Sequence, residues 1–189
     1  PEPLPFQPLK GSLGFFKEVD ISEVPGSAPD RTALQVKVEE QPTGELSFSA
    51  GYSSVDQLVL DLGVTERNFR GRGQNVRARV QVGSLRQQVD FGFTEPRFLG
   101  RDLAGGVDLY SYRYDLTEYS AYKTVTVGGN LRLAFPLTLN SRLSTRYILR
   151  QEEVQLDDAY CDPSAPIVSR SVCDSRGKYL TSLIGYTYL

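Results

Sequence analysis

Hydrophobic and polar residues alternate along most of the chain, which is the pattern of a β-strand with one apolar and one polar face. In the stretch centred on residue 80, hydrophobic Val76, Ala78, Val80 and Val82 alternate with Arg77, Arg79, Gln81 and Gly83. The same alternation predicts an all-β antiparallel meander of about eight strands, at 44–54, 57–69, 74–84, 86–98, 103–117, 120–136, 138–155 and 178–189.

Two environments produce such alternation. A soluble antiparallel sheet turns its apolar face toward a core, whereas a transmembrane barrel turns it toward lipid and its polar face toward an aqueous lumen. The runs 57–69, 103–116 and 121–137 are long against the usual soluble strand of about 5 to 6 residues. A tilted membrane strand needs about 9 to 11 residues. Strand length therefore favours a transmembrane barrel.

Every second connection is a tight turn that directly follows a phenylalanine: Phe69, Phe98 or Phe135. The segments at Phe69 and Phe98 form a two-copy F-x-G-R repeat, 29 residues apart. Aromatic rings at strand ends with arginines beyond them are typical of a membrane–water interface. We therefore predict a girdle of Phe69, Phe98 and Phe135 at the periplasmic interface. The alternative is ordinary hairpin turns, with the phenylalanines in the core of a sandwich.

The composition of the chain excludes several classes of function. The chain has 189 residues, a net charge of −2 and no His, Met or Trp. A nucleic-acid-binding protein would show a strongly basic face, and catalytic triads or zinc sites that use histidine are excluded. We expect no enzymatic activity, no cofactor and no metal site. No apolar run approaches the ~18 residues of a transmembrane helix, and the chain, which starts at Pro1 without a signal peptide, is expected to be a piece of a longer protein.

The chain has two cysteines, Cys161 and Cys173, which lie in its longest predicted connection. Two cysteines without histidine partners are too few for a zinc site. We predict a disulfide between them, which implies an oxidising compartment such as the periplasm or the cell surface. Two free thiols are the alternative.

Charged residues on the polar faces of the strands are the remaining candidates for chemistry. They could line an ion path, but in a wet interior such residues more often form cross-strand pairs. The set comprises Arg77, Arg79, Arg132, Arg142, Arg146, Asp61, Asp90 and Asp108.

Residues 1–43 follow a different pattern from the rest of the chain. Four prolines make the opening extended and irregular, and two short alternating runs, 17–22 and 33–40, flank a Pro25-Gly26-Ser27 turn. We therefore predict a small soluble hairpin at 1–43 and a second domain at 44–189.

An ordered series of motifs resembles the BamA family of outer-membrane barrel-assembly factors. The series is Leu13-Gly14-Phe15-Phe16, Val24-Pro25-Gly26-Ser27, Asp30-Arg31, Val36-Lys37-Val38-Glu39-Glu40-Gln41, Thr43-Gly44, Ser47-Phe48-Ser49-Ala50-Gly51-Tyr52, Asn68-Phe69-Arg70-Gly71-Arg72-Gly73 and Thr94-Glu95-Pro96-Arg97-Phe98. The resemblance covers residues 13–189. It implies that 1–43 is part of the last polypeptide-transport-associated (POTRA) domain and that 44–189 is the N-terminal half of a sixteen-stranded barrel.

The same resemblance implies a bacterial outer-membrane protein whose N-terminal segment lies in the periplasm. It would fold and insert other barrel proteins, with the lipid bilayer, unfolded outer-membrane protein clients and periplasmic assembly lipoproteins as partners and no nucleic acid. The chain departs from the family in three ways. Residues 1–12 do not resemble the start of a POTRA module, the later surface-loop motif beginning Val-Arg-Gly is absent, and the cysteine pair is not a family feature.

By this resemblance, the first barrel strand forms a lateral seam that templates incoming strands. The predicted gate comprises Leu46, Ser47, Phe48, Ser49, Ala50, Gly51 and Tyr52. We expect Leu46, Phe48, Ala50 and Tyr52 to face lipid. Ser47, Ser49 and Gly51 either keep this strand adaptable or are simply small residues that face the lumen.

Two further function classes stay open. One is a related barrel that secretes a polypeptide through its lumen, as in two-partner secretion, or a complete, closed eight-stranded barrel. The other is a soluble β-sandwich that binds ligands. In a soluble protein Val80, Phe91 and Leu131 would be buried together in a compact core.

Overall fold

The computed structural model describes residues 15–28, 31–54, 56–138, 140–161 and 168–189. The chain divides into two compact units, one ending at Gly44 and the other beginning at Glu45. No helix in the described part of the chain has the length and apolar character needed to cross a membrane.

The first unit is a two-stranded antiparallel hairpin of β1 (Phe16–Pro25) and β2 (Thr32–Glu40). Val19 lies opposite Val38 and Ile21 opposite Val36, so the alternating residues of the two runs meet in register. This hairpin matches the two predicted runs. That it belongs to a POTRA domain stays a prediction.

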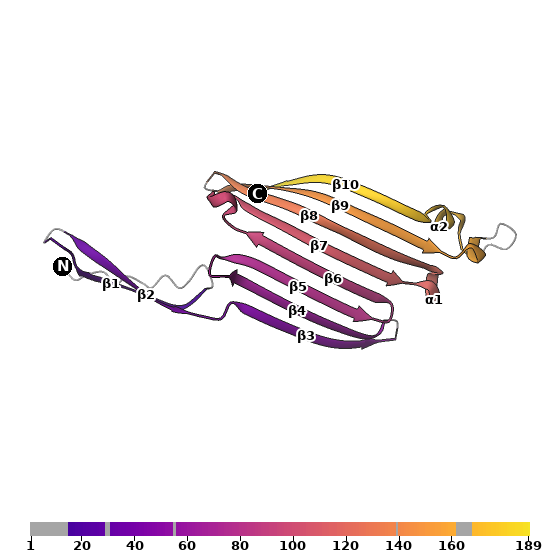
Figure 1. Cartoon of the computed structure of the whole chain (residues 1–189), viewed down its shortest axis with the longest axis horizontal. Helices are drawn as coiled ribbons and strands as arrows, with labels where there is room; N and C mark the ends of the chain where they lie inside the picture. The colour runs from indigo at the N-terminus through magenta and orange to yellow at the C-terminus, as the bar shows by residue number, and fades with distance from the viewer. Residues whose placement is uncertain (1–14, 29–30, 55, 139, 162–167) are drawn as a thin grey trace. The chain divides into compact units, whose positions relative to one another are not determined.

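The second unit is one eight-stranded sheet in which every strand pairs antiparallel with its neighbours in sequence, as Figure 1 shows. Its strands are β3 (Gly44–Ser53), β4 (Gln57–Phe69), β5 (Gln74–Gly83), β6 (Arg86–Glu95), β7 (Ala104–Asp115), β8 (Tyr122–Thr138), β9 (Ser141–Leu156) and β10 (Gly177–Tyr188). The observed strand ends lie within three residues of the predicted ones. The all-β meander is therefore confirmed.

The sheet is a single open layer with β3 and β10 as its outer strands. The described residues therefore do not form the closed eight-stranded barrel, in which those two strands would be neighbours. They do not form a sandwich either, because no second layer covers the sheet and no described hydrophobic residue is buried.

The connections fall on two rims of the sheet. We call the rim with the β4–β5, β6–β7 and β8–β9 connections the turn rim, and the opposite one the loop rim (Figure 1). Strand β6 ends at Glu95, three residues before the predicted end, because Pro96 cannot donate a ladder hydrogen bond and Phe98–Gly100 forms a 3₁₀ turn. The loop rim carries two short helices that the alternation did not predict, α1 (Thr117–Ser120) and α2 (Arg170–Asp174).

Candidate functional site: two faces and an edge strand

One face of the sheet is apolar across its whole width. Val80 lies between Leu62 and Val89, and Phe91 lies between Ala78 and Leu109, so hydrophobic side chains form continuous rows across the strands. Val80, Phe91 and Leu131 are 41%, 40% and 58% exposed. The core expected of a soluble protein is thus absent from the described residues. A soluble monomer tolerates an apolar patch of only a few hundred Å², so this face needs an apolar environment.

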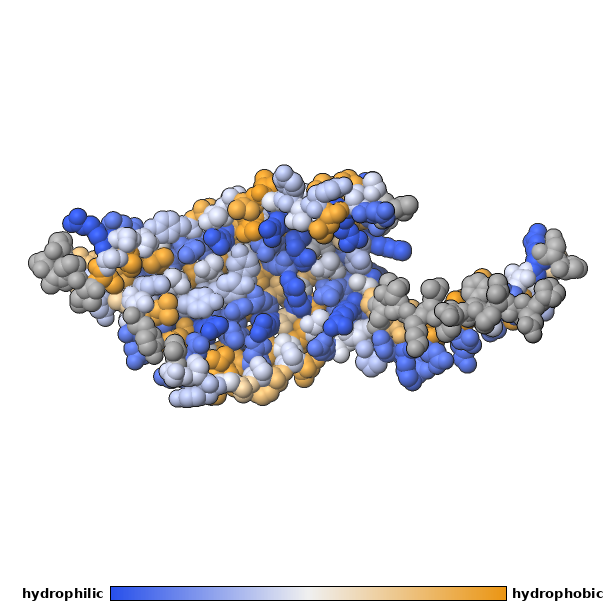
Figure 2. Space-filling view, turned by 180° about the vertical axis from the view of Figure 1, so that it is seen from behind, coloured by the Kyte–Doolittle hydropathy of each residue, from blue (hydrophilic) through white to orange (hydrophobic). Residues whose placement is uncertain are grey.

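The opposite face is polar and lined by ion pairs. Figure 2 views the sheet from behind and shows hydrophilic side chains gathered over its middle. Asp61 on β4 accepts a hydrogen bond from Arg79 on β5, with 2.9 Å between Arg79 Nε and Asp61 Oδ2. Asp61 and Asp108 are 9% and 8% exposed, and they are the buried charged residues of the described chain. A charge this far out of water must be paired, and each of these carboxylates is.

Asp108 binds two arginines that come from different strands. Arg77 Nη2 on β5 lies 2.8 Å from Asp108 Oδ1, and Arg132 Nε on β8 lies 2.7 Å from Oδ2. Arg77 reaches Asp108 across the intervening strand β6, where Gly92 lies in register between the two residues. A Cβ at position 92 would lie 2.5 Å from Arg77 Nε. The missing side chain of Gly92 is therefore what allows one ion-pair group to connect β5 to β8.

The predicted cross-strand pairs are confirmed for some residues and not for others. Arg77, Arg79 and Arg132 all pair with aspartates. Asp90 instead accepts hydrogen bonds from Tyr112 Oη, at 2.6 Å, and from Gln88 Nε2, at 2.8 Å. Among the described residues, no ion pair involves the other two predicted partners, Arg142 and Arg146.

Edge strand β3 carries the predicted gate residues. Ser47 Oγ donates to the carbonyl oxygen of Gly63 at 3.3 Å, and its side chain lies where a Cβ of Gly63 would point. Ser47 therefore shares the polar face with Gly63. Because side chains alternate along a strand, Leu46, Phe48, Ala50 and Tyr52 are on the other face, where Leu46, Phe48 and Tyr52 are 72%, 70% and 79% exposed.

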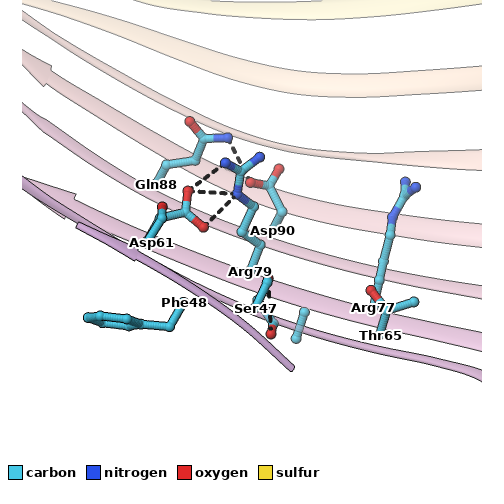
Figure 3. Close-up of a pocket in the computed structure, with 11 residues that line it drawn as sticks. Ser47, Phe48, Asp61, Thr65, Arg77, Arg79, Gln88 and Asp90 are labelled. Atoms are coloured by element: carbon cyan, nitrogen blue, oxygen red, sulfur yellow. Dashed lines mark hydrogen bonds and ion pairs between the residues drawn. The ribbon is translucent and has the colours of Figure 1, made fainter. Parts of the chain in front are cut away.

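A pocket of about 550 Å³ lies on the polar face beside β3. It is lined by Ser47 and Ser49 of β3 and by charged residues of β4 to β6 that include Asp61 and Arg79. In Figure 3 the ring of Phe48 points away from the Asp61–Arg79 pair, whereas Ser47 lies beside it. The structure thus places Ser47 and Ser49 on the polar face and the large gate residues Leu46, Phe48 and Tyr52 on the apolar face. Their role in gating stays a prediction.

The three girdle phenylalanines all lie at the turn rim, where β4 ends (Phe69), where the 3₁₀ turn after β6 begins (Phe98) and near the end of β8 (Phe135). Phe69 and Phe98 are exposed, and Phe135 lies half-buried opposite Leu143. That this rim is a periplasmic membrane interface stays a prediction.

The predicted disulfide is confirmed. Cys161 and Cys173 are bonded, with their Cα atoms 5.8 Å apart, in the β9–β10 connection at the loop rim. Beside it, Arg176 forms an ion pair with Asp158. This connection is the longest on the loop rim.

Sequence reasoning missed the glycines that underlie the polar face. Arg132 lies over Gly106, Tyr110 over Gly128 and Arg146 over Gly185, in each case within 3.3 Å of where a Cβ would stand. The sequence does contain a signal for these glycines, because each of them interrupts the polar side of an alternating strand. Only the strand register, however, shows which large side chain lies over each glycine.

The fold is an antiparallel meander of the kind that forms a barrel wall, with one apolar and one charged face. A crystal structure of BamA from Haemophilus ducreyi lacking POTRA domains 1–3 has the same fold, with a TM-score of 0.64 and 20% identity over 93% of this chain and 35% of that one. The Omp85 superfamily domain matches residues 68–189.

Curated relatives give the same assignment. The outer membrane protein assembly factor BamA of Neisseria meningitidis serogroup B is 31% identical over 137 residues, 70% of this chain and 17% of its own length. That of Nitratidesulfovibrio vulgaris is 33% identical over 145 residues, 76% of this chain and 18% of its own length. The chain belongs to the BamA/Omp85 family. It spans less than a fifth of the length of these two relatives.

Proposed function

We propose that this chain is the seam-bearing part of an outer-membrane protein assembly factor, which folds and inserts β-barrel proteins. Its sheet would lie in the bacterial outer membrane, and residues 1–43 would lie in the periplasm as part of a POTRA domain. Unfolded outer-membrane proteins would be its clients and periplasmic assembly lipoproteins its partners. Family membership supports the assembly role, and the two-faced sheet supports the membrane location.

The observation that carries the proposed mechanism is the position of β3 as an outer strand of the sheet. An outer strand presents unpaired N–H and C=O groups, which in hydrocarbon must find partners. An incoming client strand can supply them by β-augmentation. Exchange of one strand partner for another then needs no covalent chemistry and leaves few backbone groups unpaired.

The side chains of β3 suit this role. The lipid-side residues Leu46, Phe48 and Tyr52 are large and exposed, so a paired client strand would remain in contact with an apolar surface. Ser47 and Ser49 are small, and a Cβ added at Gly51 would meet no atom within 4 Å. The polar side of β3 therefore offers little steric resistance to a new neighbour.

Site-specific crosslinking in the full-length protein tests the proposal. The two natural cysteines are bonded to each other, so a cysteine introduced at Ser49 or Ala50 is a free thiol on β3. We expect it to form disulfides with a stalled client that carries cysteines along one strand. A cysteine at Ser111, an exposed residue of the central strand β7, is the matched control. Equal yields from β3 and from Ser111, in correctly assembled protein, would refute a templating role for β3.

A further inference from the structure

The two F-x-G-R segments are a structural repeat as well as a sequence repeat. Their shared residues extend back to a threonine and a glutamate, which gives the pairs Thr65/Thr94, Glu66/Glu95, Phe69/Phe98, Gly71/Gly100 and Arg72/Arg101. In both copies the residue after the phenylalanine and the glycine have positive φ, at 59° and 69° in the first turn and at 57° and 70° in the second. Both segments therefore form the same left-handed turn.

Hydrogen bonds confirm this equivalence. The N–H of Gly71 donates to the carbonyl of Asn68 at 2.9 Å, and that of Gly100 donates to Arg97 at 3.0 Å. In each copy the glutamate accepts the backbone N–H two residues further on, that of Asn68 or that of Arg97. These carboxylates are thus engaged in fixing the turns.

The turns concentrate positive charge at one rim. Arg70 and Arg72 belong to the β4–β5 turn and Arg97 and Arg101 to the β6–β7 turn, and in the described chain none of them is in an ion pair. Arg70 lies over the Phe69 ring, 5.5 Å from its centroid, and Arg72 attracts Glu95 at longer range. The two turns are two strands apart, about 10 Å at normal strand spacing. Guanidinium groups at this spacing can contact one phosphate-bearing headgroup together.

An apolar hollow opens beside the second turn. It has a volume of about 360 Å³ and lies among Phe93, Phe98, Val107, Leu131 and Leu133. Gly105 forms part of its lining, and a Cβ there would lie 2.9 Å from the Phe98 ring, so the ring covers the glycine. The hydrophobic residues of the lining are on the apolar face of the sheet, whose side chains face lipid in the proposed function.

We propose that the twin turns and the hollow together bind one anionic phospholipid. The arginines of the turns would contact its phosphate, and one acyl chain would occupy the hollow against Phe98. The charge of the turns and the continuity of the hollow with the apolar face argue for this occupant. The inference rests on the membrane location of the proposed function, but it does not depend on templating by β3.

Native mass spectrometry of the full-length protein tests the site. The protein is released from mixed vesicles of phosphatidylglycerol and phosphatidylcholine with identical acyl chains, and the bound lipids are counted. We expect the natural protein to retain phosphatidylglycerol preferentially. In a second protein, Arg70, Arg72, Arg97 and Arg101 are all replaced by Gln. Its preference for phosphatidylglycerol should be at least about tenfold lower, because each basic residue near anionic lipid contributes about 1 kcal/mol.

The matched control replaces two arginines of the loop rim, Arg113→Gln and Arg170→Gln, and should keep the preference. A second variant, Val107→Phe, fills the hollow without changing charge, and we expect it to lower retention of both lipids while the preference persists. Equal retention of the two lipids by the natural protein would overturn the proposal, as would an unchanged preference in the quadruple variant. Because no client is present, these outcomes are independent of the β3 crosslinks.

Discussion

Replacing Asp108 by Asn should destabilise the sheet more than any comparable change on its polar face. The Asp108 carboxylate accepts hydrogen bonds from Arg77 Nη2 at 2.8 Å and from Arg132 Nε and Nη2 at 2.7 and 3.1 Å. An asparagine keeps the size of the side chain but removes its negative charge. Two arginines from β5 and β8 would then remain side by side without a counter-charge.

The size of the effect follows from burial. A hydrogen bond to a charged group is worth about 1.5 to 3 kcal/mol when buried. The Asp108 side chain is 11% exposed, but those of Arg77 and Arg132 are 60% and 38% exposed, so solvent screens a large part of the attraction. We therefore expect Asp108→Asn to lower the free energy of unfolding by about 2 to 3 kcal/mol, and Arg77→Gln by about 1 kcal/mol.

The assay is equilibrium unfolding of the full-length protein in detergent micelles with urea, followed by the gel shift between folded and unfolded barrel. The control is Asp102→Asn, since Asp102 is exposed and in no ion pair within the described chain. In the double variant that combines Asp108→Asn with Arg77→Gln, the loss of unfolding free energy should be about 1 kcal/mol smaller than the sum of the two single losses. The reasoning is refuted if Asp108→Asn falls within about 0.5 kcal/mol of the Asp102 control, the range of ordinary surface changes.

Three further outcomes are expected. Gly92→Ala places a Cβ 2.5 Å from Arg77 Nε. In the same urea assay it should lower the free energy of unfolding by about 1 kcal/mol, and by less in the Arg77→Gln background, where the Nε is gone. The control Gly51→Ala, whose Cβ meets no atom within 4 Å, should show no such loss. Phe91→Arg, at the middle of β6 on the apolar face, should cost about 2 to 4 kcal/mol in lipid, measured by refolding into vesicles, whereas Thr126→Arg on the polar face should cost far less. Replacing Cys161 and Cys173 by Ser should destabilise the β9–β10 connection by up to about 3 kcal/mol and speed its proteolysis. Reduction of the natural protein with dithiothreitol should have the same effect. Equal proteolysis rates with and without the disulfide would contradict a structural role for it.

Strand positions could be predicted because alternation is a local property of the sequence. Leu60, Leu62 and Val64 alternate with Asp61 and Gly63, and this pattern fixes which residues share a face before any partner strand is known. Two strand ends are displaced by three residues, the end of β6 and the start of β9. At the end of β6, Pro96 has no N–H to pair and Phe98–Gly100 forms a 3₁₀ turn. Backbone hydrogen bonding decided that end, and hydrophobicity did not.

The ion pairs of the polar face could be predicted only as a set. Arg77 and Arg146 have similar sequence surroundings, each on the polar side of a long strand, yet Arg77 pairs with Asp108 and Arg146 lies over Gly185. The difference depends on register across two interfaces, because Gly92 and Asp108 lie in the same row as Arg77. The sequence contains no local signal for that row.

The distribution of these contacts has a mechanical consequence for the seam. Asp108 connects β5, β7 and β8 through two arginines, and Asp61 connects β4 to β5. Strand β3 pairs with β4 through the backbone, and its side chains add the Ser47 hydrogen bond, at 3.3 Å, and the exposed pair of Glu45 with Arg67, which solvent screens. The side-chain contacts at the outer strand β3 are therefore more exposed than those that connect β5, β7 and β8. If β3 exchanges strand partners as proposed, we expect it to separate from the sheet before the middle strands, which the ion pairs of Asp61 and Asp108 hold together.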